Sequence, residues 1–140
     1  MSHSFRVEAT AERLPEANTG LDAWWTSAGL PDEARFAFEL VLEEIFMNVV
    51  MHGSPPEGPA CTVEVTLDRR GDEVCMEVAD DGVRFDPLTL EDPDTSTPIE
   101  DRRVGGLGVY FVREMMDTVH YRYSEGRNHL TVSKSLGPTT

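Results

Sequence analysis

The chain has no long hydrophobic run and no apolar segment at its amino terminus. A membrane-spanning helix needs about 20 consecutive apolar residues, and a secretory signal needs an apolar stretch behind a basic start. We therefore expect neither, and we expect a cytoplasmic protein with no membrane partner. The 140 residues are enough for one domain, 1–140, that buries its own core.

Positive charge is also scarce. Twelve Lys and Arg residues stand against 26 Asp and Glu residues, which gives a formal net charge of −14. Nucleic-acid backbones and anionic lipid surfaces attract proteins of the opposite sign. The charge balance therefore argues against direct nucleic-acid binding and suits a partner with a basic surface.

Cysteine is nearly absent, because Cys61 and Cys75 are the only two. They fall on two expected neighbouring strands, Cys61–Arg69 and Asp72–Asp80. The register expected for this hairpin separates the two cysteines by about five residues, or roughly 16 Å. A disulfide needs Cα atoms within about 7 Å, so we expect free thiols. No Cys and His spacing in the sequence resembles a zinc site.

The segment from Asp32 to Gly53 combines an apolar composition with a regular polar stripe. Its hydrophobic residues occupy nearly every helical face, so the pattern predicts a largely buried helix. Glu44, Asn48 and His52 recur every fourth residue and therefore share one face of it. An unpaired buried polar group costs several kcal/mol. The three side chains must satisfy one another, cap neighbouring loops, or bind a ligand or metal ion.

A second polar residue stands out at the end of the hairpin. Joining the two strands at Arg70-Gly71 pairs Arg69 with Asp72 and brings the apolar residues of both strands to one face. Asp80 is an even number of residues from the apolar residues of its strand, so its side chain points to the same face as theirs. The pattern therefore predicts a carboxylate on the face of the sheet that the helices cover.

The remaining segments complete an α+β pattern. We expect a two-layer sandwich in which a mixed, mainly antiparallel sheet carries its helices on one face. The further expected elements are a strand at Ser4–Ala9, a helix at Ala11–Ala28, a helix from Gly105 to about Met116, and strands at Thr118–Tyr123 and Asn128–Ser135.

A long polar loop separates the hairpin from the third helix. The segment from Asp86 to Arg103 is rich in Pro, Thr, Ser and acidic residues, and such a loop in a compact domain is a functional lid or a disordered segment. We expect a lid at about 86–104. The following Gly105-Gly106-Leu107-Gly108 suits either an anion site at a helix start or a hinge. No phosphate loop of the G-x-x-x-x-G-K-[ST] form is present.

In this order and spacing, the three segments resemble the motifs of the GHKL ATPases, which share the Bergerat ATPase fold of gyrase-type and histidine-kinase-type domains. The residues that carry the resemblance are Glu44, Asn48 and His52 for the N box, Asp80, Gly82 and Phe85 for the first glycine box, and Gly106 and Gly108 for the second. The Glu-x-x-x-Asn-x-x-x-His form is similar to that of small bacterial anti-sigma-factor serine/threonine kinases.

The resemblance implies a role for each motif. Asn48 would bind Mg²⁺, Glu44 would act as general base, and Asp80 would accept a hydrogen bond from the adenine amino group while Gly82 leaves room for the base. Arg102 and Arg103 would either reach the terminal phosphate or balance charge. The implied ATP-binding residues are Asn48, His52, Asp80, Gly82, Phe85, Arg102, Arg103, Gly105, Gly106, Leu107 and Gly108.

The function implied is that of an ATP-binding serine/threonine protein kinase and anti-sigma factor. It would hold a sigma factor or similar regulator and phosphorylate a STAS-type antagonist protein. The alternative is a nucleotide-dependent sequestering module without efficient kinase activity. It rests on Arg84, which replaces a glycine usual in the first glycine box. Trp24 and Trp25 belong to the core or to a dimer surface, so a homodimer is also considered.

Overall fold

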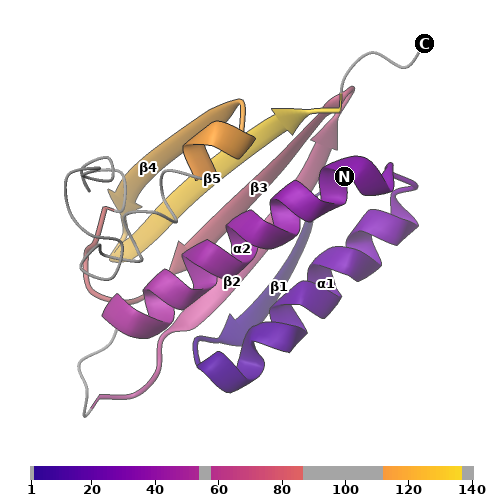
Figure 1. The fold of residues 1–140 in the computed structure, drawn as a ribbon. Coiled ribbons are helices and arrows are strands. Elements are labelled where there is room, and N and C mark those ends of the chain that lie inside the picture. The colour runs from indigo at the N-terminus through magenta and orange to yellow at the C-terminus, as the bar shows by residue number, and fades with distance from the viewer. Residues whose placement is uncertain (1, 54–57, 87–111, 137–140) are drawn as a thin grey trace, which may run out of the picture.

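The protein folds as a five-stranded antiparallel sheet with two long helices on one face (Figure 1). The computed structural model describes residues 2–53, 58–86 and 112–136. The elements are β1 His3–Glu8, a short 3-10 helix η1 Ala11–Arg13, α1 Leu14–Ser27, α2 Asp32–His52, β2 Thr62–Arg70, β3 Glu73–Asp80, β4 Thr118–Ser124 and β5 Arg127–Ser135. This confirms the two-layer α+β class.

The strands follow the order β1-β2-β3-β5-β4, which places β3 at the centre of the sheet. We expected a mixed sheet, but every strand pairing in the described ranges is antiparallel. Asp80 ends the central strand, where it pairs with Val63 on one side and Asn128 on the other. Asp80 therefore lies in the middle of the sheet, not at an exposed edge.

The hairpin register predicted from the sequence was wrong by two residues. The ladder pairs Arg70 with Glu73 and Leu67 with Met76, so the turn lies at residues 71 and 72. Gly71 adopts a positive φ of 62°, which only glycine reaches readily and which lets the ladder continue to Arg70. A shift of two residues preserves the facing of every side chain. For this reason the prediction that Asp80 faces the helices still holds.

Neither cysteine forms a disulfide bond, as predicted. Because the register differs, Cys75 pairs with Asp68, seven positions along the chain from Cys61 rather than five. Cys61 is buried where the chain enters β2. The separation across the hairpin therefore excludes a bridge more firmly than the sequence alone did.

The helix α2 runs over Asp32–His52, as the sequence predicted, and packs one side onto the sheet. The side chains it buries are Ala34, Phe38, Val41, Leu42, Ile45, Phe46 and Val49. The expectation that almost no face meets water was wrong, because Phe36 is 64% exposed and Met51 is 60% exposed. The sheet and α1 cover only part of the helix surface, and the outward side keeps its hydrophobic residues in solvent.

The first helix begins later than the sequence suggested. The stretch Ala11–Arg13 forms a 3-10 turn, and the α-helix starts at Leu14 with Pro15 in its first turn. Trp25 is buried and its indole N–H donates to the carbonyl of Pro31 at 3.0 Å. Trp24 is partly buried and packs against the core. Of the two roles considered, both side chains therefore take part in the core.

The third predicted helix is described only in part. Residues 112–115 are helical, and Val112 and Met116 are buried in the core. The loop from 87 onward, Arg102, Arg103 and the segment Gly105-Gly106-Leu107-Gly108 lie outside the described residues. Within the described ranges, no helix has the length and apolarity needed to cross a bilayer.

Candidate functional site

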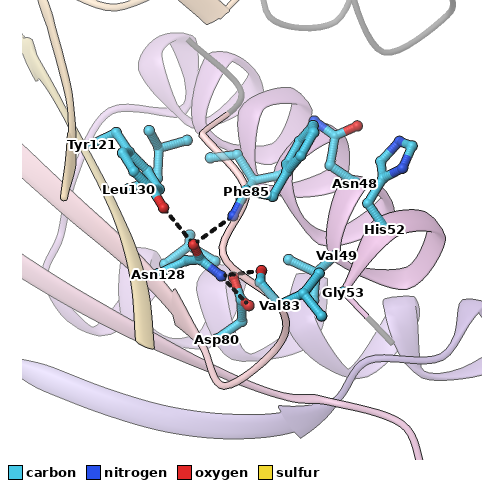
Figure 2. Close-up of a pocket in the computed structure, with 12 residues that line it drawn as sticks. Asn48, Val49, His52, Gly53, Asp80, Val83, Phe85, Tyr121, Asn128 and Leu130 are labelled. Carbon is cyan, nitrogen blue, oxygen red and sulfur yellow. Dashed lines mark hydrogen bonds between the residues drawn. The ribbon is translucent and has the colours of Figure 1, made fainter. Parts of the chain in front are cut away.

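A pocket opens between the carboxyl-terminal half of α2 and the neighbouring ends of β3 and β5 (Figure 2). It brings together residues that are far apart in the sequence. The lining residues are Ile45, Asn48, Val49, His52, Gly53, Val78, Asp80, Val83, Phe85, Tyr121, Asn128 and Leu130. Four of the predicted site residues are among them, namely Asn48, His52, Asp80 and Phe85.

Asp80 forms the floor of this pocket. The side chain is 7% exposed, and its Oδ1 accepts hydrogen bonds from the Gly82 N–H at 2.9 Å and the Asn128 amide at 3.0 Å. Burial raises the pKa of the Asp80 carboxyl, and these two hydrogen bonds oppose the rise. Within the described residues both bonds go to Oδ1, so Oδ2 remains available to accept a hydrogen bond from a ligand donor.

Asn128 organises this end of the pocket, and the sequence analysis missed it. Its Nδ2 donates to Asp80 and to the carbonyl of Val83 at 2.9 Å. Its Oδ1 accepts from the backbone N–H of Phe85 at 3.0 Å and from the hydroxyl of Tyr121. Two donors and two acceptor positions are the full capacity of a carboxamide. One buried side chain therefore fixes the carboxylate, the following loop and β4 relative to one another.

A sequence signal for Asn128 did exist. Asn128 has the same parity as Leu130 and Val132, so it belongs to the apolar, helix-covered face of β5. A polar side chain on such a face requires partners. The cross-strand position opposite Asp80 supplies them, but that pairing becomes visible only once the order β3-β5 is known.

Gly82 allows a close contact between the loop after β3 and the end of α2, while its expected role beside the base stays a prediction. A Cβ at this position would lie 2.6 Å from the carbonyl oxygen of Gly53 and 2.8 Å from Sγ of Cys61. The N–H of Val83 donates to the same Gly53 oxygen at 3.0 Å. The absent side chain thus lets the loop after β3 approach the end of α2. Atoms of Gly53 and Cys61 occupy the space that a Cβ would need.

The polar residues of α2 reach the pocket from its other side (Figure 2). The carboxamide of Asn48 lies at the pocket, and within the described residues no hydrogen bond engages it. The imidazole of His52 stacks on the ring of Phe85, with centroids 4.9 Å apart and planes at 21°. His52 therefore contacts the loop after β3, which is one of the alternatives that the sequence left open.

Glu44 does not line the pocket. It lies one helical turn before Asn48, half-buried, and the described residues provide it with no ion-pair partner. Burial, together with the neighbouring charge of Glu43, raises the pKa of the Glu44 carboxyl. A carboxylate with a raised pKa accepts a proton more readily than an ordinary glutamate.

The side chain of Arg84 lies beside two tyrosines of β4, Tyr121 and Tyr123. Its guanidinium carbon lies 5.2 Å from the centroid of the Tyr123 ring, a cation–π distance, and the side chain is exposed. Arg84 is not among the residues that line the pocket. The side chain that replaces glycine at this position is therefore not itself a wall of the pocket, although it contacts Tyr121, which is one.

The donor set at the pocket is compatible with Mg²⁺ bound mainly by a nucleotide. Among the described residues, no three His, Cys, Asp or Glu side chains cluster to hold a metal ion. Mg²⁺ prefers oxygen ligands, keeps several waters and often takes few protein ligands beside substrate phosphates. The carboxamide oxygen of Asn48, which has no partner in the described part of the chain, suits such an ion.

The fold is that of a histidine kinase-like ATPase domain, as comparison with known families shows. The family model for the histidine kinase-like ATPase domain matches residues 7–134, and the chain belongs to this family. Its similarity extends to bacterial serine/threonine kinases. The serine/threonine-protein kinase BtrW of Bordetella bronchiseptica is 31% identical over 135 residues, which cover 92% of this chain and 94% of that protein.

Two further comparisons give another similar kinase and a similar fold. The serine-protein kinase RsbW of Bacillus mycoides is 28% identical over 111 residues, covering 72% of this chain and 68% of that protein. The crystal structure of the RsbU and RsbW domains of Rv1364c from Mycobacterium tuberculosis matches with a TM-score of 0.67 at 15% identity. That match covers 96% of this chain and 32% of the longer one. These findings confirm the resemblance to GHKL ATPases and the fold.

Proposed function

We propose that this chain is an ATP-dependent serine/threonine protein kinase that acts as an anti-sigma factor in the cytoplasm. It would hold a sigma factor or similar regulator and phosphorylate a STAS-type antagonist protein. The observation that carries the proposal is the pocket that joins the buried carboxylate of Asp80 to the polar residues of α2. The kinship with serine/threonine kinases supports the reaction class.

The Asp80 end of the pocket suits adenine. A carboxylate oxygen accepts a hydrogen bond from an exocyclic amino group, whereas the keto oxygen of guanine would face it with a second acceptor. Asn128 holds the carboxylate in place by a 3.0 Å bond. Because all four hydrogen bonds of Asn128 go to protein atoms, its role is to position Asp80 and the loop.

The α2 end suits the phosphates. Asn48 would hold Mg²⁺ through its carboxamide oxygen, and the ion supplies charge neutralisation to the phosphates when it is bound. Arg102, Arg103 and the segment from Gly105 to Gly108 stay predicted phosphate contacts, since they lie outside the described residues. His52 supports this end by stacking on Phe85.

Phosphotransfer requires a base near the acceptor hydroxyl. Glu44 takes the proton of a serine or threonine hydroxyl while the hydroxyl oxygen attacks the γ-phosphorus of ATP. The bond between that phosphorus and the β–γ bridging oxygen breaks, ADP leaves, and the proton remains on Glu44. The position of Glu44 one turn from Asn48, and the raised pKa of its carboxyl, both suit this role.

The proposal is tested by incubating the purified chain with γ-labelled ATP and purified STAS-domain proteins from the same genome. We expect the label on one serine or threonine of one of these proteins. Asn48→Ala should abolish Mg²⁺-dependent ATP binding, whereas Glu44→Gln should bind ATP normally and transfer label slowly. Label on a histidine, or ATP binding without transfer to any of these proteins, would overturn the kinase assignment.

ATP binding without transfer of label would favour the alternative function, a nucleotide-dependent sequestering module. The sequence feature that supported this alternative was Arg84. Its guanidinium packs over Tyr123, and Arg84 is not among the residues that line the pocket, so this feature gives the alternative little support. The kinase is therefore the function that the site supports best.

A further inference from the structure

The outward side of α2 carries a row of hydrophobic residues that the core does not use. We call Phe36, Leu40, Met47 and Met51 the α2 stripe; their spacing of four, seven and four residues keeps them on one face of the helix. Phe36 is 64% exposed, Met51 is 60% exposed, and the other two are partly exposed. The row extends for roughly 22 Å at about 1.5 Å per residue. An ordered apolar row of this length on a surface helix marks an interaction site.

The position of the stripe connects it with the chemistry. Glu44 follows Leu40 by four residues and precedes Met47 by three, so its carboxylate borders the stripe. On its other side Glu44 is one turn from Asn48, which lies at the pocket. The proposed base thus stands between the exposed stripe and the nucleotide site. A protein seated on the stripe would bring a hydroxyl to Glu44 without crossing the core.

The charges around the stripe indicate what kind of surface fits it. Glu33 and Glu43 are exposed on the same helix, Glu43 lying within one turn of Leu40 and Met47. The whole chain carries a net charge of −14. A complementary partner must offer an apolar centre with lysine or arginine residues at its margin. A second copy of this acidic chain would instead oppose like charges.

We propose that the α2 stripe is the docking surface for the phosphoacceptor protein, and that it places the acceptor hydroxyl beside Glu44. This inference rests on the proposed kinase function and adds the surface that selects the substrate. The adaptable side chains of Met47 and Met51 and the ring of Phe36 supply the contact area. The acidic margin orients the partner by its basic residues.

The test replaces both exposed ends of the stripe, as Phe36→Asp combined with Met51→Asp. The probes are the purified STAS-domain proteins used for the labelling experiment, and Ala23→Asp on the exposed side of α1 is the matched control. We expect the KM for the acceptor protein to rise at least tenfold, or its binding to weaken equally in calorimetry. The ATP dissociation constant should stay within about twofold, and the control should behave as wild type. A milder Phe36→Ala variant should give a smaller rise in the same direction.

Several outcomes would overturn the docking surface and leave the kinase assignment standing. An unchanged KM in the double variant would place docking elsewhere. Weakened ATP binding would mean that the stripe serves the chain's own nucleotide site. A dimeric wild type that becomes monomeric in the double variant would identify a self-interface. If the wild type transfers no label, the kinase function fails. Calorimetry with the same proteins then still tests the docking surface. If none of them binds in a way that the stripe substitutions weaken, the docking proposal is overturned as well.

Discussion

At the scale of single residues, the proposed site would separate nucleotide binding from proton transfer along one helix. Asn48 lies at the pocket, whereas Glu44 stands one turn away and does not line it. Substitutions at these two neighbours should therefore give different defects. The difference is measurable because, in the proposed roles, Asn48 would act on nucleotide affinity and Glu44 on the rate of transfer.

The pH dependence of transfer should report on Glu44. Its pKa is raised by burial and by Glu43, so the carboxylate, which is the active form of a base, is lost on acidification at a higher pH than for an ordinary glutamate. We expect the kcat of the wild type to fall on the acid side with this raised pKa. Glu44→Gln should lower kcat about 10²- to 10⁴-fold and remove that acid limb. An identical acid limb in the variant would assign it to another group.

Asn128 provides a second residue-scale prediction. Asn128→Ala would leave the Asp80 carboxyl, the Val83 carbonyl and the Phe85 N–H without their shared partner. Each buried polar group left unsatisfied costs about 1–3 kcal/mol. We expect a clear loss of unfolding free energy in urea and weaker ATP binding by calorimetry.

The matched control is Thr131→Ala, on the opposite face of β5, where the hydroxyl meets Glu77 at 3.4 Å. This variant should bind ATP as the wild type does. If both variants lose stability equally and Asn128→Ala binds ATP normally, Asn128 does not position the nucleotide site.

At the scale of elements, the end of α2 and the loop after β3 meet through backbone atoms of Gly53, Gly82 and Val83. Gly82→Ala would place a Cβ 2.6 Å from the Gly53 carbonyl oxygen, which is backbone and cannot rotate away. The loop must then move and lose the 3.0 Å bond from Val83. We expect a lower melting temperature and weaker ATP binding together.

Gly71→Ala is the comparison for this variant. Nothing lies within 4 Å of a Cβ at Gly71, so its cost is limited to the positive φ of the turn. It should lower stability modestly and leave ATP affinity unchanged. Unchanged ATP affinity in Gly82→Ala would show that this contact is not needed for the pocket.

The contact between α1 and α2 contains an acidic pair. Burial raises the pKa of Glu39, and the hydrogen bond and charge of Asp22 raise it further, whereas Arg35 lowers it. The folded state therefore favours protonated Glu39. This contribution to stability is fully present below the unfolded pKa and is lost as pH rises through the folded pKa. Near pH 7 the ionised pair is unfavourable.

Asp22→Asn should relieve this repulsion and supply an amide donor to Glu39. The Oδ1 of Asp22 is buried and has no hydrogen-bond partner among the described residues. We expect the variant to be more stable than wild type at pH 7 by a few tenths of a kcal/mol, the size of a like-charge pair on helices. The gain in unfolding free energy should vanish near pH 4, where Glu39 takes up a proton. Urea unfolding of variant and wild type at pH 7 and at pH 4 measures the difference. A gain of equal size at both would indicate an effect other than charge.

At the scale of the whole molecule, the excess of acidic residues should make stability depend on salt. A net charge of −14 on 140 residues produces self-repulsion that dissolved ions screen. We expect the melting temperature to rise by a few degrees between about 20 and 200 mM NaCl. Glu33→Gln combined with Glu43→Gln should reduce this response. A melting temperature that falls with salt would show that attractive ion pairs dominate instead.

The sequence predicted the parts of the molecule that depend on local patterns. The bounds of α2 follow from Pro31 and Gly53, and the facing of Asp80 follows from strand alternation. Asn128 could not be found this way, because its importance arises from pairing with a strand almost fifty residues earlier. The contact of Gly82 with Gly53 and the exposed side of α2 likewise depend on which segments meet in space. Local chemistry predicted the elements, and their neighbours defined the site.

The length of α2 has a consequence for how such a chain can diverge. One helix carries the core face, the pocket residues and the α2 stripe, each at a fixed rotation about its axis. Removing or adding one residue turns everything beyond that point by about 100°. A deletion near Leu42 would rotate Asn48 and His52 away from the pocket and would expose core residues to solvent. Over evolutionary time α2 can therefore exchange residues at many positions. The insertion or deletion of one residue would instead disturb the core face, the pocket residues and the α2 stripe together.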